Sequence, residues 1–157
     1  MNSREPYLIL GIGNSLLSDD GAGVHAARLL QAEPPPGTAV LAAETDFLSA
    51  LPFLEQCVKA LVIDAMDAEQ PPGTLYRCRG EELAATGQRH SLHELGLLEV
   101  LEFLDRSHRP EVHILGVQPG RIGLALDLSP AVAAALPQVV QAARQIIAGF
   151  SSFDLTH

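Results

Sequence analysis

The stretch YLILGIGNSLLSDDGAG, residues 7–23, decides the fold class of this 157-residue chain. It opens with a continuous apolar run at 7–11, which suits a strand buried on both faces of a parallel sheet. Glycines follow at once, and a helical apolar pattern starts near Gly21. A buried strand, a glycine-rich turn and a helix make the first half of a βαβ unit, so the sequence predicts an α/β fold.

The rest of the chain continues this alternation of strands and helices. Further strands are expected at Thr38–Ala43, Ala60–Asp64 and Val112–Val117, with an edge strand at Thr74–Arg79. Helices are expected at Gly21–Leu30, Phe47–Cys57, Leu92–Leu104 and from Pro130 to about Ala148, the last with Ser129 as its N-cap and a kink at Pro137. The pattern predicts a single domain over 1–157, built as a mostly parallel twisted sheet with helices on both faces, and a frayed tail at 151–157.

Charge and composition exclude several classes of function. Ten Lys+Arg against 19 Asp+Glu give a net charge of −9, and Lys59 is the one lysine. Binding to nucleic acid or to anionic lipid needs a basic surface, so we expect neither partner. The apolar run near the N-terminus is too short for a membrane span. Cys57 and Cys78 form no CxxC pair, which favours a reducing compartment, the cytoplasm.

Acidic residues follow the predicted strands at the edge where open α/β sheets bind ligands. Asp19 and Asp20 precede the first helix, and Asp64 closes the third strand. Asp19 and Asp20 could simply cap the helix, and Asp64 could be a turn residue. Capping accounts well for one aspartate and poorly for two adjacent ones. All three are therefore candidate site residues.

A histidine is the third element of the candidate site. His93 lies in the first turn of a helix that Ser91 and Glu94 begin with a capping box. The positive end of a helix keeps imidazole neutral, which is its metal-binding form. The plain alternative is a partly exposed histidine at a helix end, and His90 is a weaker candidate. Two aspartates and a histidine suit a divalent cation with an open coordination position, so we predict Asp20, Asp64 and His93 as metal ligands.

Several segments, in order along nearly the whole chain, together resemble the hydrogenase maturation proteases: GIGNSLLSDDGAG at 11–23, VIDAMD at 62–67 before PPG at 71–73, SLHELGL at 91–97, LGVQP at 115–119 and LSPAV at 128–132. The resemblance implies an endopeptidase that removes the C-terminal extension of a nickel–iron hydrogenase large-subunit precursor after nickel insertion. It matches the family's metal positions to Asp20, Asp64 and His93, although some members carry glutamate at the first. The implied metal is nickel supplied by the substrate, with other divalent cations as further occupants of the site.

Three alternatives differ in their chemistry. A dinucleotide-binding domain would place Glu44 on a ribose, but the third glycine of its motif falls at Leu16. A response-regulator receiver needs a lysine after its last strand, where Gln118 stands. A nickel-sensing chaperone with the same metal site and no cleavage remains open.

Catalysis by the chain would use a water molecule rather than an acyl-enzyme. The spacing supports neither a Ser-His-Asp nor a Cys-His arrangement. The metal could polarise the scissile carbonyl, activate the water or serve as a recognition handle. Asp19 is the first candidate for a general base, and Asp20 is the second catalytic candidate.

Overall fold

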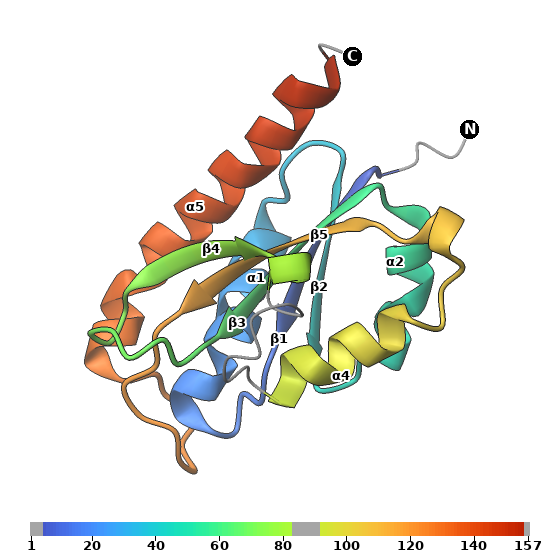
Figure 1. Ribbon diagram of the computed structural model, residues 1–157. Helices are drawn as coiled ribbons and strands as arrows, with labels where there is room; N and C mark the ends of the chain where they lie inside the picture. The colour runs from blue at the N-terminus through green and yellow to red at the C-terminus, as the bar shows by residue number, and fades with distance from the viewer. Residues whose placement is uncertain (1–4, 83–91, 156–157) are drawn as a thin grey trace.

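A computed structural model describes residues 5–82 and 92–155, with side chains left undescribed at 92–95 and 152–155. Its centre is a five-stranded sheet in the order β2-β1-β3-β5-β4 (Figure 1). Four strands are parallel, and β4 runs antiparallel to β5 at the edge. The predicted α/β class, the mostly parallel sheet and the edge strand are confirmed. The strands are β1 (Tyr7–Ile12), β2 (Thr38–Glu44), β3 (Lys59–Ala65), β4 (Leu75–Arg79) and β5 (Glu111–Val117).

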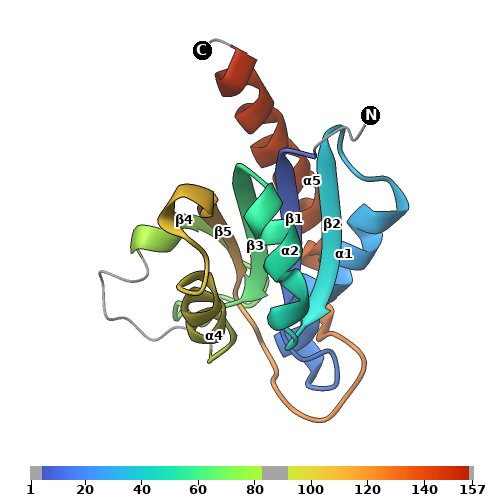
Figure 2. The ribbon, with the colours of Figure 1, turned by 90° about the vertical axis from the view of Figure 1, so that its right-hand side faces the viewer.

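Helices cover both faces of the sheet, as expected. One face carries α1 and α5, and the other carries α2 and α4, which lie toward the viewer in Figure 2. None of the helices in the described part of the chain has both the length and the apolarity that a membrane span requires. The helices are α1 (Ala22–Ala32), α2 (Leu51–Gln56), α4 (Leu92–Leu101) and α5 (Pro130–Leu155), with short 3-10 turns η1 (Ser18–Gly21), η2 (Leu48–Ala50) and η3 (Arg106–His108).

Helix α1 lies within two residues of its expected boundaries, whereas the other three helices differ by three residues or more. The segment expected as one helix at Phe47–Cys57 consists of η2 followed by α2, with Pro52 in the first turn of α2, where a proline costs no hydrogen bond. Helix α4 ends three residues early, at Leu101. Helix α5 continues through Pro137 and past Ala148 to Leu155, so the backbone of 151–155 is helical.

The core forms two layers because side chains alternate along each strand. Ile9, Leu61 and Leu115 face α1 and α5, while Leu10 and Val62 face α2 and α4. Strands β1 and β3 are buried along their whole length, which explains their continuous apolar sequences.

The start of α1 lies against the carboxyl ends of two strands. A Cβ added at Gly23 would lie 2.0 Å from the carbonyl oxygen of Ile63 and 2.8 Å from that of Ile12. Only glycine permits this approach. The contact holds η1, with its two aspartates, at the edge where β1 and β3 end.

Candidate metal and peptidase site

Asp20 and Asp64 approach the same turn of the chain, residues 13–14. Asp64 is the penultimate residue of β3, lies opposite Gly116 of β5 and has no exposed surface. Asp20 is also buried, and its Oδ2 accepts a hydrogen bond of 3.0 Å from the amide of Asn14. A Cβ added at Gly13 would lie 3.5 Å from Asp64 Oδ1. Asp20 thus bonds to this turn and Asp64 lies close to it, which places two of the three predicted ligands beside the same two residues.

Gly13 is required by the geometry of this turn. Its φ is +130°, a backbone conformation that only glycine adopts readily. An added Cβ would also lie 2.0 Å from the carbonyl oxygen of Asp20. The glycine motif in the sequence therefore serves to bring η1 close to the end of β1.

The position of the third predicted ligand is known from the backbone of α4. His93 lies in the first turn of α4, while its side chain, and all of His90, fall outside the described residues. A Cβ added at Gly96 would lie 2.8 Å from the ring of Phe47, which follows β2. The first turns of α4 thus lie near the carboxyl edge of the sheet. Among the described residues no group of three metal-ligating side chains occurs, so the His93 assignment stays a prediction.

Asp19 holds the loop after β5 against η1. It has no exposed surface, and its two oxygens accept four hydrogen bonds from that loop. Oδ1 accepts from the amide of Ser129 at 2.7 Å. Oδ2 accepts from the amides of Gly120 and Arg121, each at 2.8 Å, and from the Ser129 hydroxyl at 2.6 Å. Asp19 therefore links two segments that are 101–110 residues apart.

These contacts also set the ionisation of Asp19. Burial acts to raise the pKa of the carboxyl group, but the hydrogen bonds from Ser129, Arg121 and Gly120 outweigh it and hold the pKa below its usual value. A carboxylate that is buried and already accepts four hydrogen bonds is a poor proton acceptor for a substrate water. The geometry favours an anchoring role for Asp19 over the general base considered from the sequence.

Neither aspartate caps its own helix, contrary to the plain interpretation of the sequence. No side-chain cap hydrogen bond occurs at η1 or at α1. Ser129 directly precedes α5 as expected, and its carbonyl oxygen accepts from Ala133 N at 2.8 Å, while its hydroxyl donates to Asp19. Sequence reasoning could not find this pair, because no local pattern links residues so far apart.

Gln118 clamps the loop after β3, a role the sequence did not reveal. Its Oε1 accepts from the amides of Ala68 and Gln70 at 2.7 and 3.2 Å. Its Nε2 donates to Asp67 Oδ1 at 3.0 Å. Gln118 stands where a response-regulator receiver would have its lysine, and here it joins the end of β5 to the loop after β3. Asp67 is exposed, as expected.

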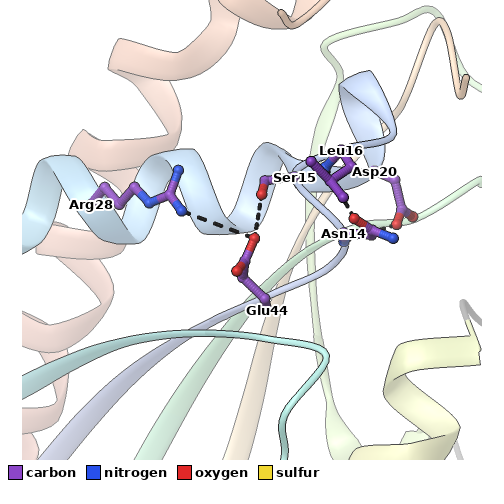
Figure 3. Close-up of polar contacts among 6 residues, drawn as sticks. All are labelled: Asn14, Ser15, Leu16, Asp20, Arg28 and Glu44. Atoms are coloured by element: carbon purple, nitrogen blue, oxygen red, sulfur yellow. Dashed lines mark hydrogen bonds and ion pairs between the residues drawn. The ribbon is translucent and has the colours of Figure 1, made fainter. Parts of the chain in front are cut away.

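A polar cleft of about 350 Å³ opens at Asn14, which bonds to Asp20 (Figure 3). It is lined by Asn14, Ser15, Leu16, Arg28, Glu44 and Thr45. Glu44 accepts a hydrogen bond from the Ser15 hydroxyl, and Arg28 Nη2 lies 3.9 Å from Glu44 Oε1. The φ of Glu44 is +53°, a strained value for a non-glycine residue. Glu44, unassigned from the sequence, therefore belongs to the wall of a cleft next to Asn14 and Asp20.

The chain is similar in sequence to several proteins of hydrogenase maturation. The family model for hydrogenase maturation protease (HycI) matches residues 24–146, a range that contains Asp64 and His93 and begins after Asp20. The hydrogenase expression/formation protein HupM of Azotobacter chroococcum is 32% identical over 149 residues, covering 85% of this chain and 71% of that protein. HupD of Rhodobacter capsulatus is 37% identical over 101 residues, and the match spans 48% of its length, so the chain corresponds to about half of that relative.

Two solved structures match almost the whole chain. The hydrogenase maturating endopeptidase HybD from E. coli has a TM-score of 0.78 at 27% identity, covering 93% of this chain and 92% of that one. The [NiFe] hydrogenase maturation protease HybD from Thermococcus kodakarensis has the same TM-score of 0.78 at 31% identity, covering 89% and 97%. The sheet order, the converging aspartates and these matches lead to one assignment: the chain belongs to the hydrogenase maturation protease family.

Proposed function

We propose that the chain is a cytoplasmic endopeptidase that removes the C-terminal extension of a nickel–iron hydrogenase large-subunit precursor after nickel insertion. The observation that carries the proposal is the approach of Asp20 and Asp64 to the turn at 13–14. The approach lies at the carboxyl edge of a parallel sheet, where ligands bind in such folds. The structural relatives from E. coli and T. kodakarensis are named as an endopeptidase and a protease of hydrogenase maturation.

In this proposal nickel arrives as part of the substrate. Two carboxylates and an imidazole suit a borderline divalent cation, and three protein ligands leave positions for groups already on the metal. Asp20, Asp64 and His93 would thus dock the nickel and hold the extension in the crevice. Nickel acts here as the recognition handle, and other divalent cations can take its place in the isolated protein.

Cleavage itself is a hydrolysis. The oxygen of a water molecule bonds to the scissile carbonyl carbon, the C–N bond breaks, and a water proton passes to the leaving amine. Asp19 is enclosed by its four hydrogen bonds. We therefore assign the proton-accepting role to Asp20, whose carboxylate bonds to Asn14 in the wall of the cleft.

The rim of this edge supports a protein-sized substrate. Leu16, Leu124 and Leu126 expose 57, 89 and 66% of their surface. Their two loops are joined, because Ser18 N donates to Ala125 O at 2.7 Å and Ala125 N donates to Leu16 O at 3.1 Å. Large exposed apolar side chains on a fixed loop are typical of protein interaction surfaces.

The decisive experiment incubates the purified protein with precursor large subunit, with and without nickel, and follows the precursor's mass. We expect shortening of the nickel-loaded precursor alone, and loss of shortening in His93→Ala and Asp64→Asn. His108→Ala, which removes an exposed histidine of η3, is the matched control and should process normally. Equal cleavage of nickel-free precursor would refute nickel recognition. Tight binding of the loaded precursor without any shortening would instead identify the nickel-sensing chaperone.

A further inference from the structure

A second cavity lies at the opposite end of the sheet from the aspartates. Its volume is about 470 Å³, and it is formed where β3 and β5 begin and β4 ends, under the last turns of α5. Strand β1 also begins at this end, and α5 ends there (Figure 2). The side chains that matter in this cavity are Lys59, Arg77, Arg79, Glu111, His113 and Phe150.

The lining of this cavity is mainly basic, although the chain as a whole is acidic. Three of the ten Lys+Arg residues line it, whereas among the described residues only Glu111 of the 19 Asp+Glu does so. In a chain of net charge −9, a concave surface with this composition is a local positive site.

A buried histidine orients one of the arginines. Arg77 Nη2 lies 3.0 Å from His113 Nδ1, and His113 Nε2 lies 2.9 Å from Glu111 Oε1. Because a guanidinium only donates hydrogen bonds, Nδ1 must accept and the ring proton must be on Nε2. Burial lowers the pKa of His113, in agreement with a neutral ring. His113 therefore positions Arg77 without neutralising its charge.

The other two cations are also held in place. Arg79 Nη2 pairs with Glu111 Oε1 at 3.2 Å, across from His113 on the neighbouring strand. Lys59 is 9% exposed, and its ammonium lies 5.1 Å from the centre of the Phe150 ring. A buried lysine and two exposed arginines, one of them oriented by the buried His113, form a preorganised set of donors.

We infer that this cavity binds a small oxyanion carrying at least two negative charges. Guanidinium groups match phosphate and carboxylate oxygens in a bidentate manner, and an ammonium adds a point charge. The volume exceeds that of a single phosphate ion and lies within the range of small-molecule sites. Phosphoryl and carboxyl groups share this recognition chemistry, so pyrophosphate and citrate represent the two sources in the test.

A substitution at Gly149 can fill space in the cavity without removing any of its charged side chains. It lines the cavity from α5, and a Cβ added there meets no atom within 4 Å. Leucine at this position can extend into the cavity, and the fold tolerates it because helix propensity rises. Gly149→Ala adds only the Cβ and is the matched control.

The test is isothermal titration calorimetry of the full chain with pyrophosphate and with citrate, at constant ionic strength set by chloride. We expect saturable binding of at least one ligand, weakened at least about tenfold by Arg77→Gln, Arg79→Gln or Gly149→Leu. Gly149→Ala should bind within about twofold of the parent, as should Arg106→Gln, which removes an exposed arginine of η3 that does not line the cavity. Circular dichroism verifies the fold of each variant. Absence of saturable binding of both ligands overturns the inference, as does equal weakening by Arg106→Gln.

Discussion

Replacing Asp19 by asparagine tests whether this residue anchors the edge of the site. The change keeps the side-chain volume and removes the charge. An asparagine oxygen at the Oδ2 position could still accept from Gly120, Arg121 and the Ser129 hydroxyl. Its NH₂ group would then face the amide of Ser129, which lies 2.7 Å from Oδ1 in the parent. One buried donor would lose its acceptor.

The expected loss of stability follows from these contacts. A buried donor left without a partner costs about 1–3 kcal/mol, and the remaining bonds weaken because they lose the help of a full charge. We therefore expect Asp19→Asn to lower the free energy of unfolding by about 2–4 kcal/mol. Asp19→Ala, which leaves all four donors without an acceptor, should lose at least about 4 kcal/mol. Ser129→Ala removes only the hydroxyl bond and should lose about 1–2 kcal/mol.

Urea unfolding followed by far-ultraviolet circular dichroism measures these differences, since the chain has no tryptophan to report by fluorescence. The pH dependence gives a second test. Because the folded pKa of Asp19 is lowered, its stabilisation is complete above the unfolded value of about 3.9 and is lost as pH falls through the folded pKa. The stability gap between parent and Asp19→Asn should therefore narrow below about pH 4. An asparagine variant as stable as the parent at pH 7 would refute the anchoring argument.

Three further predictions concern the other residues. Gly13→Ala should displace Asp20, because the carbonyl oxygen of Asp20 lies 2.0 Å from the added Cβ. We expect the free energy of unfolding in urea to fall by at least about 2 kcal/mol. Gly123→Ala is the control: its added Cβ meets open space, so it should have little effect. His93→Ala should lower the free energy of unfolding by no more than about 0.5 kcal/mol yet reduce processing of nickel-loaded precursor at least about tenfold, and parent-like processing would exclude His93 from the site. The pKa of His113 is lowered in the folded state, so the unfolded chain takes up a proton first as pH falls below about 6.5. The parent should therefore lose stability between pH 7 and pH 5, and His113→Gln should lose less. Identical pH profiles of the two proteins in urea unfolding would contradict this.

Local patterns in the sequence were enough for most of the fold. The strands β1, β3 and β5 are apolar on both faces along most of their length, and this property identifies a central parallel strand. Their polar residues, such as Lys59 and Asp64 of β3, lie near the strand ends. Proline and glycine marked the breaks between elements. The helix after β2 was less regular than expected, since η2 and α2 share a segment whose apolar spacing fits one helix.

The candidate site likewise contains some contacts that the sequence predicts and others that it does not. The nearness of Asp20 and Asp64 could be expected because Asp64 lies at the end of β3 and Asp20 follows β1, and the carboxyl ends of parallel strands share one edge. The anchoring of Asp19 by Ser129 and the clamp formed by Gln118 could not, because their partners lie tens of residues away with no repeating pattern between them. The basic cavity was equally hidden. Lys59, Arg77 and His113 appear as unrelated residues until sheet pairing places them side by side.

The hydrogen bonds of Asp19 to the loop after β5 can form only late in the synthesis of the chain. The ribosome adds Asp19 to the chain 110 residues before Ser129. Most of the chain is therefore made before the segment that holds Asp19 in place exists. A nascent chain that has completed β1, β2 and β3 already contains both carboxylates, yet its working edge is still open. The bonds of Asp19 to Ser129 form only once the chain reaches the start of α5, so a shorter translation product would contain both carboxylates without this anchor.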